Sequence, residues 1–267
     1  MAPTSTSDKW HSGDAYERYM GRWSRQLAPR FLGWLDVPPG QRWLDVGCGT
    51  GALSAAILHG CAPSALIGVD PSEGFLATAR SQLAASVVLH RAAASQMPLA
   101  DAAVDVAVSA LVLNFVPDAH AALCEMARVT ADGGRVAACV WDYAQKMDLI
   151  RIYWDAAAQL GLLGPGQDQA ERFPLCHPDA LAAAFAGAGL SRVEVSAIEI
   201  PMRLVDFDDY WQPFLGGQGP APAHAMSLDE AARNRLRDLI RERMPVQPDA
   251  TIALEARAWT ARGIVAK

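Results

Sequence analysis

The feature that most constrains the fold of this chain is a glycine-rich turn between an apolar segment and a helical one, RWLDVGCGTGALS at residues 42–54. Three glycines in five residues let a ligand approach the backbone closely, and the pattern formally satisfies the dinucleotide fingerprint G-x-G-x-x-G/A. In α/β folds such a turn connects a parallel strand to a covering helix. The glycines alone leave open which ligand the turn holds.

Strand-like and helix-like segments alternate from about residue 42 to residue 140, which predicts a parallel sheet covered by helices. Ser72 and Asp118 are placed to cap two of the helices. We expect strands at 42–46, 64–70, 86–92, 104–113, 134–142, 191–200 and 255–266, and helices at 51–60, 72–84, 118–129 and 178–190.

Three segments lie outside this regular pattern, at 1–40, 142–177 and 201–254, and they contain five of the eight tryptophans. Each tryptophan could simply anchor its segment to the core. Alternatively, the segments form an apolar lid over a pocket at the carboxyl ends of the strands. Within the last segment we expect a surface loop at 215–223 and a helix at 227–244 that begins with a capping box at Ser227 and Glu230.

The composition and charge of the chain argue against several classes of partner and site. The net charge is −6 and there is no basic run, so a nucleic-acid partner has little support. The apolar run at 104–116 is too short and too polar to span a bilayer. Five cysteines without C-x-x-C, and no export signal at the N-terminus, predict a cytoplasmic protein without a disulfide framework. No His, Cys and carboxylate cluster has metal-site spacing, so we expect no metal.

Two carboxylates refine the choice of ligand. Asp45 lies two residues before the first glycine, where it would repel a pyrophosphate and attract an ammonium or sulfonium group. Asp70 ends the next predicted strand, where a carboxylate can accept both hydroxyls of a ribose. The pair favours a nucleoside ligand that carries a cation and no phosphate.

Four stretches together resemble the class I S-adenosylmethionine-dependent methyltransferases, and in particular the type-11 branch that includes ubiquinone/menaquinone C-methyltransferases. They are WLDVGCGTGALS, LIGVDPSEGFLATAR, AAASQMPLADAAVDVAVSALVLNFV and MARVTADGGRVAACVWD. The resemblance implies an α/β, Rossmann-like, doubly wound sheet of seven strands, mostly parallel with an antiparallel last strand. It also implies S-adenosyl-L-methionine as the cofactor. We expect one domain over 1–267, with an N-terminal lid at 1–40, a cofactor-binding core at 41–142, and helical cap insertions at 142–177 and 201–254 around the acceptor.

The resemblance also assigns cofactor contacts. Asp45 to Gly51 would line the methionine half, Asp70 with Pro71 and Ser72 the ribose, and Ala93 and Ala94 the adenine. The family often has an acidic or amide residue at the position of Ala93 and Glu at that of Ser95, so the adenine amino group would rely on Ser95, Gln96 or backbone carbonyls. In the N-terminal lid, Tyr19 and Arg22 could meet the cofactor carboxylate or cover its sulfonium, and Arg22 could instead form a surface ion pair. The predicted cofactor residues are Tyr19, Arg22, Asp45, Gly47, Cys48, Gly49, Thr50, Gly51, Asp70, Pro71, Ser72, Ala93, Ala94, Ser95 and Ser109.

Methyl transfer from a sulfonium is an in-line displacement in which the protein mainly aligns the reactants and excludes water. A base is needed only if the acceptor must lose a proton. The candidates are His11, His177 and Asn114, although His177 could equally serve only as a helix entry. The predicted acceptor-pocket residues are Tyr16, Trp23, Asp142, Tyr143, Trp211 and Phe214.

The leading hypothesis is methyl transfer to a small apolar or aromatic metabolite. One alternative keeps S-adenosylmethionine without methyl transfer, as a binding protein or a cyclase. A more remote alternative is an NAD(P)-dependent oxidoreductase, against which Asp45 and residues 93–118 argue.

Overall fold

The computed structural model describes residues 17–217 and 219–266, in which one seven-stranded sheet forms the centre. The strand order is β3-β2-β1-β4-β5-β7-β6. β1 to β5 run parallel, and β7 runs antiparallel to both of its neighbours, β5 and β6. The predicted fold class is therefore confirmed. The strands are β1 (Arg42–Val46), β2 (Ala65–Asp70), β3 (Val88–Arg91), β4 (Val104–Ala110), β5 (Thr130–Trp141), β6 (Ser191–Leu204) and β7 (Ile252–Ile264).

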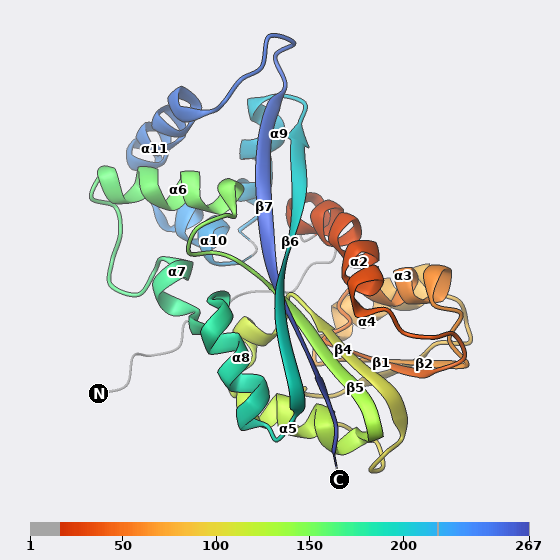
Figure 1. Cartoon of the computed structure of the whole chain (residues 1–267). Coiled ribbons are helices and arrows are strands. Elements are labelled where there is room, and N and C mark those ends of the chain that lie inside the picture. Colours follow the sequence, from red (N-terminus) through yellow and green to blue (C-terminus); the bar gives the residue numbers. More distant parts are fainter. Residues whose placement is uncertain (1–16, 218, 267) are drawn as a thin grey trace.

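Helices cover both faces of the sheet and create two apolar cores (Figure 1). On one face lie α2 (Arg22–Leu35), preceded by the short helix η1 (Glu17–Gly21), and α3 (Ala52–Gly60); they bury Phe31, Leu35 and Ile57. On the other face α5 (Ala119–Val129) and α8 (Pro178–Gly187) bury Met126 and Phe185. Because both faces are covered, the central strands are apolar almost throughout, as parallel strands usually are.

The two predicted helix caps are confirmed. The hydroxyl of Ser72 accepts the backbone N–H of Phe75 at 3.3 Å and starts α4 (Glu73–Gln82). The carboxylate of Asp118 accepts the N–H of Ala121 at 2.8 Å and starts α5. Each cap satisfies a backbone donor that the first turn of a helix leaves unpaired.

A helical cap sits on the long β6–β7 pair, at the upper end of the molecule in Figure 1. Stacked aromatic rings from α6, α9 and η4 fill its interior, among them Tyr153, Tyr210 and Phe214. The cap elements are α6 (Asp148–Gln159), α7 (Gln169–Arg172), η3 (Pro174–Cys176), α9 (Phe207–Trp211), η4 (Gln212–Gly216), α10 (Pro220–Ser227) and α11 (Glu230–Arg243).

Three local predictions are wrong. Much of the surface loop expected at 215–223 forms the start of helix α10, in which Pro220, Ala221 and Pro222 are buried. Proline suits the first turn of a helix because no N–H partner is needed there. Strands β5, β6 and β7 are also longer than expected. β6 and β7 pair with each other past the end of β5, as far as Leu204 and Ile252, and β5 already begins at Thr130.

The third error is the capping box. Ser227 is the last residue of α10, and its hydroxyl donates to the carbonyl of His224 at 2.7 Å. Helix α11 begins instead after Asp229, whose carboxylate accepts the N–H of Ala232 at 2.7 Å. Ser227 and Asp229, two positions apart, both carry an oxygen that can cap a helix, and only Asp229 lies outside the preceding helix α10.

None of the helices formed by residues 17–217 and 219–266 is both long and apolar enough to cross a membrane.

Candidate cofactor and acceptor site

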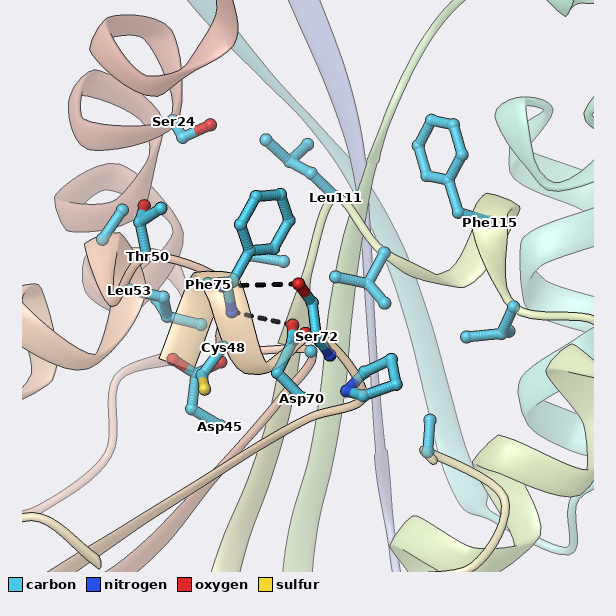
Figure 2. Close-up of a pocket in the computed structure, with 18 of the residues that line it drawn as sticks. Ser24, Asp45, Cys48, Thr50, Leu53, Asp70, Ser72, Phe75, Leu111 and Phe115 are labelled. Atoms are coloured by element: carbon cyan, nitrogen blue, oxygen red, sulfur yellow. Dashed lines mark hydrogen bonds between the residues drawn. The ribbon is translucent and has the colours of Figure 1, made fainter. Parts of the chain in front are cut away.

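A cavity of about 800 Å³ opens at the carboxyl ends of the parallel strands (Figure 2). Its walls come from the loops after β1, β2 and β3, the loop from β4 to α5, the end of β5, and the inner face of η1 and α2. This volume lies in the upper part of the range for small-molecule sites, roughly 300–1,000 Å³. The sheet therefore places the glycine turn, both predicted carboxylates and an apolar surface around one space.

The glycine turn itself leads from β1 into α3. Gly47, Gly49 and Gly51 have φ of +72°, +53° and +95°, a region that glycine adopts without a steric penalty. A Cβ on Gly47 would come within 2.5 Å of the side chain of Val112. The turn is thus packed so closely against the β4–α5 loop that Gly47 has no room for a side chain.

Several backbone donors of the turn are already used by the protein. Gly47 and Cys48 donate to the carbonyl of Val69 at 2.8 and 3.0 Å, and Gly51 donates to the carbonyl of Cys48 at 2.9 Å. Gly49 donates to the Asp70 carboxylate at 3.0 Å. A pyrophosphate cradle requires such N–H groups to point at the ligand, so this arrangement weighs against a dinucleotide.

Asp45 lies at the end of β1, beneath the turn, and is 1% exposed. The hydroxyl of Ser54, in the first turn of α3, donates to its carboxylate at 2.6 Å. Burial raises the pKa of Asp45 to about 7, the Ser54 hydrogen bond opposes this rise, and the nearby Asp70 adds to it. A buried carboxylate of this kind gains from a cationic ligand, as the sequence predicted. Ser54 was not predicted; its only sequence signal is a hydroxyl within an otherwise apolar helix.

Asp70 ends β2 and joins two loops. One carboxylate oxygen accepts the N–H of Gly49, and the other accepts the N–H of Ser72 at 2.8 Å. Burial raises the pKa of Asp70, while these two backbone donors oppose the rise. Figure 2 shows Asp70 beside Ser72 and close to Cys48 and Asp45. Both carboxylate oxygens are thus fixed in place at the edge of the cavity.

Most of the predicted cofactor residues line the cavity. The structure brings together Asp45, Gly47, Cys48, Gly49, Thr50, Asp70, Pro71, Ser72, Ala93, Ala94 and Ser95. The last three form a tight turn in which Gln96 donates to the carbonyl of Ala93 at 3.1 Å, and Gln96 itself does not line the cavity.

Four predicted cofactor residues lie elsewhere. Gly51 starts α3 behind the turn, and Ser109 donates to the carbonyl of Val46 at 2.9 Å, which ties β4 to β1. Tyr19 packs edge-on against Phe214 with ring centroids 5.4 Å apart. Arg22 donates to both carboxylate oxygens of Asp209 in the cap, at 2.8 and 3.0 Å.

Of the predicted acceptor-pocket residues, Tyr143 lines the cavity and Tyr16 lies outside the described residues. Trp23 packs beneath the guanidinium of Arg22, and Asp142 pairs with Arg257 at 2.5 Å. Trp211 and Phe214 stack on each other inside the cap. Indeed, none of the described residues of 201–254 lines the cavity.

Two of the three predicted catalytic residues lie among the described residues. His177 is exposed and precedes α8, where its carbonyl accepts the N–H of Leu181 at 3.0 Å. Asn114 lies in the short helix η2 (Leu113–Phe115), with a buried Oδ1 that has no hydrogen-bond partner among the described residues. Neither of them lines the cavity, and His11 lies outside the described residues.

Sequence reasoning missed the apolar wall opposite the carboxylates. The wall combines one face of α2 with the residues that follow β4 and end β5. Its members are Met20, Ser24, Leu27, Ala28, Leu111, Val112, Phe115, Cys139 and Trp141. The only available signal was apolar periodicity, which marks an ordinary buried helix face just as well.

Comparisons with known proteins agree with this geometry. Residues 44–138 match the family described as a methyltransferase domain of type 11. The chain is 35% identical over 135 residues to a malonyl-[acyl-carrier protein] O-methyltransferase from Serratia marcescens, covering 48% of this chain and 52% of that protein. It is 33% identical over 138 residues to the ubiquinone/menaquinone biosynthesis C-methyltransferase of Geobacter sulfurreducens, covering 49% and 52%. The match thus spans about half the length of these relatives.

The fold has close counterparts among solved structures. A putative methyltransferase from Bacillus halodurans superposes with a TM-score of 0.61 at 13% identity, covering 90% of this chain and 99% of that one. S-adenosylmethionine is the cofactor that the resemblance implies, and the family match confirms it. Residues 44–138 form a type-11 methyltransferase domain, and this part of the chain belongs to the class I S-adenosylmethionine-dependent methyltransferases.

Proposed function

We propose that this protein transfers a methyl group from S-adenosylmethionine to a small apolar or aromatic metabolite by in-line displacement. The observation that carries the proposal is the cavity itself, in which two buried carboxylates face an apolar wall. When bound, the cofactor supplies an activated methyl group on a positively charged sulfur.

The residues of the chain would divide the work of binding. Asp70 would accept the ribose hydroxyls, and Asp45 would attract the positive charge of the methionine half. The loop at Ala93–Ser95 would lie along the adenine. The tight fit of Gly47 against Val112 would hold the turn in one position, so that the methyl group is aligned rather than merely bound.

The apolar wall would hold the acceptor and exclude water. We propose that η1 and α2 form the roof of this space, because Met20, Ser24, Leu27 and Ala28 line it. The cap at 142–177 would contribute mainly through Tyr143. The remainder of the cap would support the roof from outside, through the Arg22–Asp209 ion pair.

A thermal-shift panel tests the cofactor assignment. S-adenosylmethionine and S-adenosylhomocysteine should each raise Tm, because a ligand at one hundred times its Kd stabilises a fold by roughly 2.7 kcal/mol. NADH and NADPH should have no effect. A shift with NADPH alone would overturn the proposal.

Asp70→Asn provides the residue-level test. It should weaken S-adenosylhomocysteine binding by at least about tenfold, because one ribose acceptor is replaced by a donor. The exposed Asp179→Asn, on the first turn of α8, is the matched control and should bind as the wild type does. Unchanged binding by Asp70→Asn would remove the ribose assignment.

Activity is tested separately by measuring S-adenosylhomocysteine release with a panel of apolar and aromatic acceptors. Binding of the cofactor without release for any acceptor would favour the alternative of a binding protein or a cyclase.

A further inference from the structure

The cavity is divided by charge. The carboxylates of Asp45 and Asp70 lie at the end that the glycine turn forms. Figure 2 shows Ser24, Leu111 and Phe115 away from them, toward α2 and the β4–α5 loop. The side chains on this second side are apolar except for the exposed carboxylate of Asp118 and two hydroxyl groups. The hydroxyl of Ser24 donates to the carbonyl of Met20 at 3.2 Å, and the other belongs to Tyr143.

Two rings in the apolar part are held by a third ring behind them. Phe115 packs edge-on against Phe173 with centroids 4.9 Å apart, and Tyr143 packs against the same ring at 5.6 Å. Phe173 is itself almost fully buried. Aromatic walls fixed in this way suit a flat, ring-bearing ligand body, since ring–ring packing adds to simple burial of apolar area.

Such walls also restrict the charge that an acceptor can carry. An isolated ion loses its hydration in an apolar space and gains little in return. Among the described residues on this side no Lys or Arg side chain lines the cavity, and the one carboxylate, that of Asp118, is exposed and caps α5. The compensating charge available to an acceptor here is the positive sulfur of the methyl donor, so the apolar walls favour an anion placed against that sulfur and disfavour a second cation.

Resting on the proposed function, we infer that the methyl acceptor is an organic oxyanion, a carboxylate or an acidic phenolate or enolate, carried on an apolar, ring-bearing body. In the transfer, a lone pair of the oxyanion forms an O–CH3 bond. The S–CH3 bond breaks, and its electron pair stays on sulfur. No proton moves, and one anion and one cation become a neutral ester or ether and a neutral thioether. Neutralising two opposite charges is favoured where water is excluded.

An amine acceptor would behave differently in the same space. Its methylation leaves a positively charged ammonium among Leu111, Phe115 and Trp141, and further reaction requires the loss of a proton. Apart from the exposed Asp118 at the start of α5, the walls on this side carry no charge that would compensate this cation. The charge distribution of the cavity therefore distinguishes between these two classes of acceptor.

The test compares binding to two complexes of the full chain by calorimetry. One complex contains S-adenosylhomocysteine, which has a neutral sulfur. The other contains sinefungin, an analogue with a protonated amine near the position of the transferred methyl group. The probes share one ring body: 2-naphthoate, neutral 2-naphthamide and cationic 2-naphthylmethylamine, with 1-nitro-2-naphthol at pH 8 as the phenolate arm.

We expect both oxyanions to bind the sinefungin complex roughly tenfold or more tightly than the S-adenosylhomocysteine complex, which corresponds to ~1.4 kcal/mol. The amide should bind both alike, and the amine should prefer the neutral complex. A methylation assay with S-adenosylmethionine then shows whether the carboxylate or the phenolate is the acceptor. Equal preference for all probes, tighter binding of the amine to the sinefungin complex, or no binding of any probe would overturn the inference.

Two phenylalanine variants show where the probes bind. Phe115→Ala removes a cavity wall and should weaken all probes together, whereas Phe207→Ala, on α9 and away from the cavity, should not. Failure of the proposed function is distinguishable, because it would appear earlier as absent binding of both cofactor analogues or as transfer to no acceptor at all. Methylation of the amine alone would support the proposed methyl transfer but contradict the inference that the acceptor is an oxyanion.

Discussion

At the scale of single residues, the burial of Asp45 makes the stability of the ligand-free protein depend on pH. The pKa of Asp45 rises from 3.8 to about 7 because the carboxylate is desolvated, with only the Ser54 hydrogen bond opposing the change. The folded state therefore binds this proton more tightly than the unfolded state does. The resulting stability is fully present below pH 4 and is lost as the pH rises through about 7.

Asp45→Asn tests this linkage. The variant keeps an oxygen for the Ser54 hydroxyl and never ionises, so at pH 8 the ligand-free variant should be more stable than the wild type. Three pKa units correspond to at most roughly 4 kcal/mol. Urea unfolding at several pH values should show the difference growing between pH 4 and pH 7. Asp179→Asn should show no such trend, and a difference that does not depend on pH would contradict the prediction. We expect the stabilised variant to bind S-adenosylmethionine more weakly.

Gly47 and Gly40 form a matched pair for the glycine turn. Both have positive φ, but a Cβ on Gly47 would meet Val112 at 2.5 Å, whereas nothing lies within 4 Å of a Cβ on Gly40. Both alanine variants carry the backbone strain of about 1 kcal/mol. Only Gly47→Ala must also displace the β4–α5 loop, so it alone should lose cofactor binding by calorimetry. Equal losses in both variants would mean that strain, and not the contact with Val112, is responsible.

At the scale of elements, the choice of cap decides where α11 begins. Asp229→Ala removes the acceptor for the Ala232 N–H and should lower the free energy of unfolding by about 1 kcal/mol. Ser227→Ala removes a hydrogen bond at the end of α10 and should cost less. Urea denaturation of both variants checks the order. A larger loss of unfolding free energy for Ser227→Ala would support the capping box that the sequence predicted.

Elements also show which kinds of sequence signal are dependable. The strands at 42–46 and 65–70 were predicted to within a residue, because each is a short apolar run that ends in a carboxylate and a turn. The start of β5 at Thr130 was missed, because the glycines of TADGG read as a stop whereas Gly133 donates to the carbonyl of Val265. That partner lies more than 130 residues away, and no local pattern announces it.

At the scale of the whole molecule, the Arg22–Asp209 pair connects the N-terminal helix to the cap, 187 residues further along the chain. The sequence left two roles open for Arg22, a contact with the cofactor carboxylate or a surface ion pair, and the structure pairs Arg22 with Asp209. In a double-mutant cycle of Arg22→Met and Asp209→Asn, the coupling energy should be about 1 kcal/mol, because both side chains are partly exposed to water.

Cofactor binding by the same variants separates the two roles of Arg22. If the arginine serves only as a tie, both single variants should bind S-adenosylmethionine alike. If only Arg22→Met binds S-adenosylmethionine much more weakly, Arg22 contacts the cofactor as well.

The sequence by itself determined the sheet, the glycine turn and the two carboxylates, because each depends on neighbours within a few residues. The resemblance to the type-11 methyltransferases assigned Ala93–Ser95 to the cofactor, and these residues line the cavity. Only the tertiary structure decided the apolar wall, the partners of Arg22 and Asp142, and the absence of lining residues from the described part of 201–254. Side chains of charged and aromatic residues reach whichever partner the fold brings nearest, and that partner is set by packing between distant segments.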